Sequence, residues 1–219
     1  MTAIRDAVFE RIRRALGPAL GDAQKISAEA EELIATPSAF QPQFPDQSNL
    51  QRFIAKATSE RVTATVSQID ELQQVPGEVA AYLKSSSLAP RIVLQPREIL
   101  TGLNWEGIEL DHDLMQDEFV AVSIADLAIA ETGSVVFLSS NDAPTLLNFL
   151  PLYQVVVVKA SLIFRYLEDV FVFVGNGQGN QPRNINIVTG TSGTADIEAK
   201  NIRGAHGPKF MHIIIVGAA

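Results

Sequence analysis

Glu131 has the sequence setting that most favours acid–base or nucleophilic chemistry. It begins the polar step Glu131-Thr132-Gly133-Ser134, between flanks that are apolar and strand-like. We expect a tight turn here, with Gly133 free to adopt a positive φ. A carboxylate beside Ala, Ile and Val residues is expected to be partly desolvated, which makes it a stronger general base or nucleophile. The alternative is that Glu131 only accepts hydrogen bonds from backbone N–H groups at the turn.

The second candidate site is a loop of small and hydroxyl-bearing residues that follows a strand-like run ending at residue 188. Small residues let a backbone approach a ligand closely, and hydroxyl groups can donate hydrogen bonds. A helix expected to begin near Ala195 would add free N–H groups and a positive dipole end. These features predict a site for a small anion. Its residues are Gly190, Thr191, Ser192, Gly193, Thr194 and Ala195.

The same loop has a simpler interpretation, in which Ser192 or Thr194 caps the helix and nothing is bound. Asp196 and Glu198 fit either interpretation. Negative charges in a first helical turn stabilise the helix, but they also repel an anion. Both readings of the loop therefore stay open at the level of the residues.

Other kinds of site are excluded by composition or by spacing. The 219-residue chain has no cysteine, so it cannot form disulfides, thiolate zinc sites, cysteine-bound iron–sulfur clusters or a catalytic thiol. Its three histidines lack metal-ligand spacing, and the glycine-rich stretch 175–180 departs from the dinucleotide-binding pattern. We read that stretch as a loop, and we expect neither a metal nor a bound cofactor.

Charge and hydropathy limit the partners. The net charge of −8 argues against nucleic acid and against an anionic membrane surface, because both are bound by basic faces. No apolar segment follows the charges at the N-terminus as in a secretory signal, and the longest apolar runs are too short to span a bilayer. We therefore expect a cytoplasmic protein.

Apolar periodicity indicates how the chain begins. Residues 2–16 repeat apolar positions at helical spacing, and a second short helix is expected over 27–35. Three prolines around Phe40 and Phe44 then predict an extended arm. We expect residues 1–45 to form a helical extension with this arm. Its two aromatic residues dock either on the protein's own domain or on a partner subunit.

Residues 46–219 are expected to form one α/β domain. Helical patterns at 50–57 and 79–83 alternate with strand-like runs. Several runs are apolar at successive positions, which is typical of strands in a largely parallel sheet that helices cover on both faces. The runs are 61–66, 91–94, 120–123, 135–138, 154–159, 185–188 and 212–216.

Four ordered motifs resemble those of the lactate utilization (LUD) domain family, and within it those of the C-type proteins. The resemblance extends from about residue 50 to residue 219. The motifs are Ala-Ile-Ala-Glu-Thr-Gly-Ser at 128–134, Leu150-Pro151, Ser-Gly-Thr-Ala-Asp-Ile-Glu at 192–198, and Gly-Ala-His-Gly-Pro at 204–208 followed by Met211-His212. The resemblance implies a three-layer, Rossmann-like fold with a mostly parallel sheet, related to sugar-phosphate isomerases and CoA transferases. Within these motifs the residues that support the site would be Thr132, Gly133, Asp196 and His206.

The resemblance also implies a role in oxidising L-lactate to pyruvate beside two partner proteins that carry iron–sulfur clusters. The chain would be a non-redox subunit that binds a small carboxylate or another anion and docks on those partners. Self-association into a homo-oligomer is left open. Two alternatives remain. One is a CoA-transferase-like or sugar-phosphate isomerase-like enzyme that uses Glu131, and the other is a structural subunit without a ligand.

This chain departs from the family pattern at two positions. The family usually has Arg where Gly193 stands, and it has His where Gln154 stands. An arginine in an anion loop would supply a bidentate, charge-assisted contact. Its replacement by glycine predicts that the loop binds anions weakly.

Overall fold

The computed structural model covers residues 1–219 and describes residues 2–16, 23–111, 120–175, 181–195 and 201–217. The chain divides into two compact units, Met1–Gln43 and Phe44–Ala219. The first unit contains α1 (Thr2–Leu16), α2 (Ala23–Ala35) and a single 3-10 turn, η1 (Pro37–Ala39). The helix predicted over 2–16 is confirmed, and the second helix begins four residues before the predicted start at 27. Among the described residues, no helix has the length and apolar character needed to cross a bilayer.

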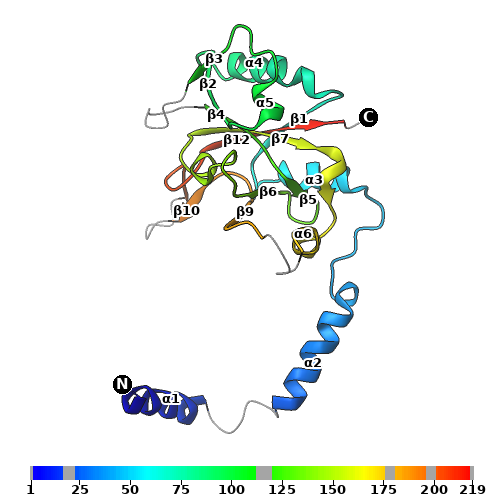
Figure 1. The fold of residues 1–219 in the computed structure, drawn as a ribbon. Helices are drawn as coiled ribbons and strands as arrows, with labels where there is room; N and C mark the ends of the chain where they lie inside the picture. Colours follow the sequence, from blue (N-terminus) through cyan, green and yellow to red (C-terminus); the bar gives the residue numbers. More distant parts are fainter. Residues whose placement is uncertain (1, 17–22, 112–119, 176–180, 196–200, 218–219) are drawn as a thin grey trace. The chain divides into compact units, whose positions relative to one another are not determined.

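A six-stranded sheet forms the centre of the unit Phe44–Ala219 (Figure 1). Every neighbouring pair of its strands is parallel, which confirms the predicted parallel sheet. Most of the buried side chains on the three central strands are Val, Ile or Ala. In spatial order the strands are β1 (Thr65–Ile69), β12 (Phe210–Val216), β7 (Tyr153–Lys159), β4 (Val120–Ile124), β2 (Arg91–Leu94) and β3 (Glu109–Asp111).

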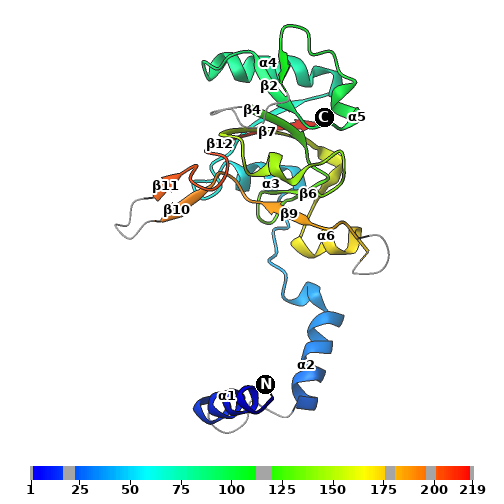
Figure 2. The same cartoon turned by 60° about the vertical axis from the view of Figure 1, so that its left-hand side comes forward.

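Different layers cover the two faces of this sheet (Figure 2). One face packs against α4 (Val75–Ser85) and the short α5 (Glu98–Thr101), through residues such as Val79 and Leu83. The other face packs against α3 (Asn49–Ala57) and against a second sheet. The prediction of helices on both faces is therefore only half right.

The second sheet has four strands and is mostly antiparallel. Its order is β8 (Ile163–Phe164), β5 (Leu127–Ile129), β6 (Ser134–Leu138) and β9 (Ile185–Val188). The runs 135–138 and 185–188 thus pair with each other in antiparallel fashion instead of joining the parallel sheet. A tight turn joins β5 to β6. Such a short connection allows only antiparallel pairing, because parallel neighbours need a much longer crossover. The helix α6 (Leu167–Phe173) packs on the outer side of this sheet through Val170.

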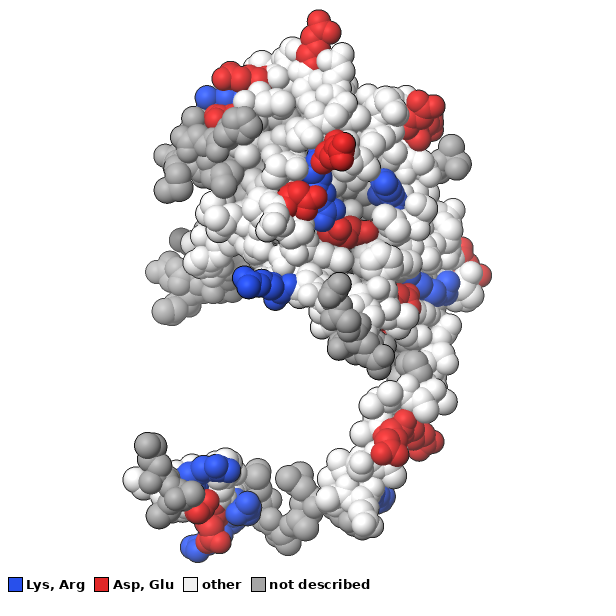
Figure 3. Space-filling model, viewed as in Figure 1, with Lys and Arg blue, Asp and Glu red and all other residues white. Residues whose placement is uncertain are grey.

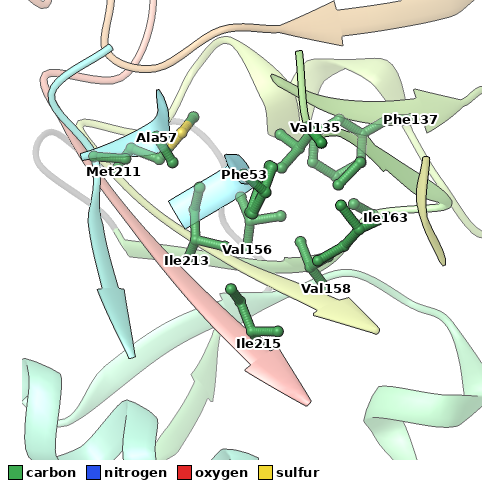
Figure 4. Packing of buried hydrophobic residues seen from close by; sticks show 14 residues of the cluster. Phe53, Ala57, Val135, Phe137, Val156, Val158, Ile163, Met211, Ile213 and Ile215 are labelled. Carbon is green, nitrogen blue, oxygen red and sulfur yellow. The ribbon is translucent and has the colours of Figure 1, made fainter. Parts of the chain in front are cut away.

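The core between the two sheets is made of aromatic and branched aliphatic side chains (Figure 4). Phe53 of α3 and Phe137 of β6 meet Val156 of β7 and Ile213 of β12, and all four are 2% exposed or less. Burying a side chain of this size contributes roughly 1.5–3 kcal/mol of transfer free energy. The helix α3 is aligned for this packing by a capping box between Ser48 and Gln51 at its start.

Three short 3-10 turns lie in the connections. They are η2 (Leu72–Gln74), η3 (Thr145–Asn148) and η4 (Ala160–Leu162).

The strand β1 begins later than predicted, at residue 65 instead of 61. Thr63 has a φ of 61°, in the left-handed region, which a strand does not accommodate. Val62 and Ala64 are buried as the alternating pattern predicts, yet they belong to the turn before the strand. The alternation identified the buried side chains and misplaced the start of the strand.

The described residues around Ala195 form a strand where the start of a helix was predicted. Gly193–Ala195 is a strand, β10, which pairs in antiparallel register with β11 (Asn201–Arg203). Thr194 lies opposite Ile202 in this hairpin, and a pair of β-branched residues favours extended structure. Asp196 and Glu198, which were expected in the first turn of the helix, lie outside the described residues, as does most of the loop expected at 175–180.

Phe44, the second aromatic residue of the proline-rich segment, is the first residue of the unit Phe44–Ala219 and packs within that unit. Phe44 is 7% exposed, and the guanidinium groups of Arg52 and Arg165 lie 4.9 Å and 4.3 Å from its ring centroid. The ring of Tyr166 lies 5.6 Å from it, and Arg165 Nη2 donates a hydrogen bond to the Phe44 carbonyl. The side chain of Phe40 is exposed, so the expected docking of both rings is borne out for Phe44 alone.

Candidate functional site

The turn that contains Glu131 joins β5 to β6, as its sequence predicts. Gly133 has a φ of +73°, which confirms the expected positive φ. A Cβ atom at this position would lie 2.6 Å from the backbone nitrogen of Ala57, so the turn packs directly on the end of α3. Gly133 is therefore required both by its backbone conformation and by its close contact with a neighbouring helix.

The carboxylate of Glu131 binds the start of a neighbouring helix. The residue is half-buried, and its Oε2 accepts a hydrogen bond of 3.3 Å from the backbone nitrogen of Leu167, the first residue of α6. Its own backbone nitrogen donates to the carbonyl of Arg165. A negative charge at a helix N-terminus is stabilising. This geometry supports the reading of Glu131 as a hydrogen-bond acceptor, although the N–H group belongs to α6 and not to the turn.

A line of hydroxyl groups connects this turn to the second candidate segment. Thr132 Oγ1 lies 2.7 Å from Ser134 Oγ, which lies 2.7 Å from Thr189 Oγ1. Thr189 directly follows β9 and precedes the predicted anion loop. The tertiary structure thus brings together the two segments that the sequence singled out, although Glu131 itself points to α6.

Two backbone N–H groups of the predicted anion loop are used inside the protein. Thr191 N donates to Val62 O at 3.1 Å, and Ser192 N donates to Pro208 O at 2.8 Å. Gly190 has a φ of +73°, and a Cβ there would lie 1.9 Å from Val62 O. The glycine therefore lets the loop pack on the chain before β1, and these two N–H groups are not free to bind a ligand.

Thr191, which the sequence indicated, lies in a cluster with two side chains that the sequence did not indicate. Thr63 Oγ1 lies 2.5 Å from Thr191 Oγ1, and Arg203 Nη1 donates to the same Thr191 oxygen at 3.4 Å. Thr63 holds its hydroxyl there with a φ of 61°, a strained conformation that is unusual for a β-branched residue. We call Thr63, Thr191 and Arg203 the hydroxyl–arginine cluster.

Arg203 lies directly opposite Gly193 in the β10–β11 hairpin. The resemblance to the LUD family leads one to expect an arginine at position 193, and the facing strand carries one instead. Arg203 was missed because a helix was predicted at Ala195, and a helix has no facing strand. The one sequence feature that could have indicated a hairpin is the β-branched Thr194 between two small residues, a pattern that is compatible with a strand.

The hydroxyl–arginine cluster lies at the amino ends of the parallel strands. The backbone carbonyls that accept hydrogen bonds from this loop belong to Val62 and Pro208, which precede β1 and β12. Lys209 N donates to Leu152 O just before β7. The loop follows β9, which belongs to the second sheet, so it does not lie at the carboxyl ends of the parallel strands. His206 lies in the adjoining turn with an exposed side chain, and Thr194 is half-buried in β10.

Gln154 stands in β7 where the family usually has histidine. It is fully buried, and neither its Oε1 nor its Nε2 has a hydrogen-bond partner within the described part of the chain. Ser123 Oγ of the neighbouring strand β4 is also buried without such a partner. Buried polar groups are usually hydrogen-bonded, so these atoms are an unexplained feature of the sheet interior.

His212 is the buried histidine of the main sheet. Its Nδ1 lies 2.8 Å from Thr65 Oγ1 and its Nε2 lies 3.1 Å from Ser67 Oγ, both on β1. The ring stacks on Tyr82 of α4 at a centroid distance of 4.6 Å. Burial lowers the pKa of His212, and the nearby charge of Glu78 opposes this only in part. A neutral imidazole fixed on both nitrogens is a structural residue here.

A cavity of about 240 Å³ lies at the opposite edge of the main sheet, at the carboxyl ends of β2, β4 and β7. Sequence reasoning did not find it, because its charged residues follow three different strands and form no motif. The residues that line the cavity are Arg97, Ile99, Ile124, Ala125, Asp126, Lys159, Leu162 and Phe173.

The surface charges of the domain are mixed. Acidic and basic side chains are interspersed over the domain face shown in Figure 3, with no broad basic patch.

Comparison with known proteins adds four findings at the level of sequence. The LUD domain matches residues 45–216. Lactate utilization protein C of Shouchella clausii is 30% identical over 51% of this chain and 51% of its own length. The protein of the same name from Macrococcus caseolyticus is 27% identical over 74% of this chain and 71% of its own length. The protein of this name from Geobacillus kaustophilus is 33% identical over 48% of this chain and 45% of its own length. The chain therefore spans about half the length of two of these relatives.

A solved structure shares the fold. The crystal structure of a DUF162 family protein from Deinococcus radiodurans aligns with a TM-score of 0.56, over 77% of this chain and 96% of that one. The two sequences are 19% identical, so the likeness concerns the fold alone. It agrees with the α/β architecture and the mostly parallel central sheet.

Proposed function

Because the chain belongs to the LUD domain family, we propose that it serves in lactate utilization as a non-redox subunit that binds a small carboxylate. Relatives named lactate utilization protein C support the process. The absence of cysteine supports the non-redox role, since thiolate-bound iron–sulfur clusters would have to reside on other proteins. In this proposal the chain docks on such iron–sulfur partners and contributes substrate binding.

The hydroxyl–arginine cluster is the observation that carries the carboxylate proposal. A guanidinium group binds a carboxylate through two parallel hydrogen bonds, and threonine hydroxyls can pair with a 2-hydroxy or 2-oxo group. Arg203, Thr191 and Thr63 bring these groups to one place. A small 2-hydroxy or 2-oxo acid such as lactate or pyruvate carries both complementary groups on adjacent carbons.

Arg203 accounts for the family arginine that is missing at position 193. Directly opposed residues of an antiparallel pair have Cβ atoms about 4.5–5.5 Å apart, so a long side chain on either strand can reach the same ligand. The cross-strand position of Arg203 therefore preserves the charge of the loop while Gly193 leaves room beside it.

The position of Glu131 argues against the alternative function, an enzyme of the CoA-transferase or sugar-phosphate isomerase class that would use this carboxylate. Its carboxylate accepts a hydrogen bond from the Leu167 N–H group at the start of α6. A nucleophile or general base has to reach the reacting atom of its substrate. This contact supports a role for Glu131 in stabilising α6.

Thermal unfolding in the presence of ligand tests the proposal. L-lactate, pyruvate or phosphate that binds the folded state raises the melting temperature by mass action. The variant Arg203→Gln should weaken carboxylate binding by about ten- to a hundredfold, since one charge-assisted contact is worth about 1.5–3 kcal/mol. The matched control is Arg183→Gln, because Arg183 is exposed at the opposite end of β9.

Gly193→Arg provides a second arm of the same experiment. Position 193 lies in an extended strand, so an arginine fits there, and it would face Arg203 across the hairpin. Like charges directly opposed destabilise the free hairpin, whereas an anion between them is bound more tightly. Equal responses of wild type, Arg203→Gln and Gly193→Arg to all three anions would contradict a carboxylate site at this cluster.

A further inference from the structure

The cavity at the carboxyl ends of the strands lies where the strand order reverses. After β2 the chain moves outward to β3 at the edge of the sheet, and it then returns to β4 on the other side of β2 and continues to β7 and β12. The crevice between β2 and β4 is therefore the switch point of this sheet. In open α/β sheets, ligands bind in this crevice, outside the carboxyl ends of the strands.

A fixed ion pair forms one wall of the cavity. Arg97 follows β2 and Asp126 follows β4, and their side chains are joined by two hydrogen bonds of 2.8 Å and 3.2 Å. Asp126 Oδ2 also accepts a 2.7 Å hydrogen bond from Leu138 N, so the carboxylate is held from two sides. Arg97 Nε is buried and lacks a hydrogen-bond partner within the described part of the chain. The pair is neutral as a whole, and the Arg97 Nε–H group is a donor that the pair does not use.

Lys159 brings an uncompensated positive charge to the cavity. It is the last residue of β7 and is half-buried, and it makes no ion pair with any described residue. The remaining lining is apolar, from residues such as Ile124, Leu162 and Phe173. An apolar enclosure strengthens the attraction between Lys159 and an anion, because the local dielectric constant is lower than in water.

We propose that this cavity binds a short-chain aliphatic monocarboxylate, with the carboxylate on Lys159 and Arg97 and the hydrocarbon tail against the apolar walls. One unpaired charge matches a monoanion better than a dianion. A volume of about 240 Å³ corresponds to about eight water molecules, which matches the size of a small organic acid. The site is separate from the hydroxyl–arginine cluster, which lies at the amino ends of the strands.

The apolar walls give the proposal a quantitative signature. Each methylene group that moves from water into an apolar site improves affinity by about fourfold. Binding should therefore strengthen from acetate to propionate to butyrate, and butyramide, which is neutral, should bind much less. At the hydroxyl–arginine cluster the proposed contacts are polar and charged, so binding there should not follow this order.

Chemical-shift titration of the isotope-labelled full chain with these four probes tests the site directly. We expect the amide signals of Ile124, Ala125 and Leu162 to move in the order butyrate, propionate, acetate. Lys159→Met keeps most of the aliphatic stem and removes the charge, and it should weaken butyrate binding at least tenfold. The matched control is Lys84→Met on the exposed side of α4, which should bind like wild type.

Three outcomes would overturn the proposal. They are the absence of shifts at these amides, equal binding by Lys159→Met and Lys84→Met, and equal binding of butyrate and butyramide. Leu162→Trp, which fills the cavity, should abolish the shifts while the circular dichroism spectrum stays native. Arg203→Gln should leave them unchanged, so a failure of the hydroxyl–arginine cluster as a carboxylate site is distinguishable from a failure of this cavity.

Discussion

Gly190 shows at the scale of one residue how a position expected to face a ligand can serve packing instead. Its φ of +73° and its close approach to Val62 O leave no room for a side chain. The neighbouring N–H group of Thr191 donates to that same carbonyl. The loop is therefore anchored by its backbone, and its side chains, with Arg203 from the facing strand, carry any chemistry it has.

Replacing Gly190 with alanine should destabilise the protein strongly. We expect Gly190→Ala to lower the free energy of unfolding by about 2–6 kcal/mol, because a strained backbone conformation and a steric overlap each cost about 1–3 kcal/mol. Urea denaturation measures the change. The glycine loop would have another role if Gly190→Ala were as stable as wild type.

Gly77 offers a matched control for this substitution. It lies in α4, and a Cβ there would meet no atom within 4 Å. Gly77→Ala should raise the free energy of unfolding by about 0.5–1 kcal/mol, since alanine loses less backbone entropy in a helix than glycine does. The two variants change the same chemical group, so opposite signs would show that the site decides the effect.

At the scale of elements, His212 joins three of them. It lies on β12, contacts Thr65 and Ser67 on β1, and stacks on Tyr82 of α4. Burial holds its pKa below the ordinary value for histidine, and Glu78 on the same helix acts in the opposite direction with a smaller effect. Protonation of His212 would therefore be disfavoured in the folded protein, and the packing of β1, β12 and α4 becomes linked to pH.

The stability contributed by neutral His212 should be lost as the pH falls below about 6.5, the ordinary pKa of histidine. Above that pH both folded and unfolded chains hold a neutral imidazole. Below it the unfolded chain binds a proton that the folded chain resists, so stability declines by at most about 1.4 kcal/mol per pH unit until the lowered folded pKa is reached.

Urea denaturation of His212→Gln on both sides of pH 6.5 checks this linkage, and His206→Gln serves as a control because His206 is exposed. The variant at 212 should lose this component of the pH dependence, and the variant at 206 should keep it. Identical pH profiles for wild type and His212→Gln would exclude His212 as the titrating group.

At the scale of the whole molecule, the domain presents two distinct edges of one parallel sheet. The hydroxyl–arginine cluster lies at the amino ends, where β10 and β11 project, and the cavity with Lys159 lies at the carboxyl ends. Phe44, at the start of the domain, lies with its ring against two arginine side chains. Cation–π contacts of this kind add to the burial of the ring.

The docking of Phe44 predicts a large effect on stability and none on association. Phe44→Ala should lower the free energy of unfolding by about 3–5 kcal/mol, as is usual for truncating a buried phenylalanine. Phe40→Ala is the control, because Phe40 is exposed and its truncation should cost little. Calorimetric melting measures both effects.

Sedimentation separates this docking from the alternative of a partner subunit. Since Phe44 is buried against residues of its own domain, Phe44→Ala should leave the sedimentation coefficient of the folded protein unchanged. A shift toward smaller species, with little change in melting, would mean that the ring is buried between subunits.

Local sequence patterns were sufficient to predict the α/β class, the parallel sheet and most element positions. The run 91–94 and the run 185–188 coincide with β2 and β9, because the spacing of apolar side chains reports burial along one segment. The positive φ of Gly133 was predictable for the same reason, since a turn between two strands is a local property. The four ordered motifs likewise identified the family.

The arrangement of side chains from distant segments was decided only by the tertiary structure. Arg203 faces Gly193 because 193–195 pairs as a strand, and the local preference of small and hydroxyl residues did not distinguish that hairpin from a helix cap. Arg97, Asp126 and Lys159 meet because three parallel strands end at one edge, beside a reversal of strand order. Strand order and register depend on long-range packing, which no short stretch of sequence encodes. For that reason the sequence determined which segments matter, and only the fold determined which residues lie together.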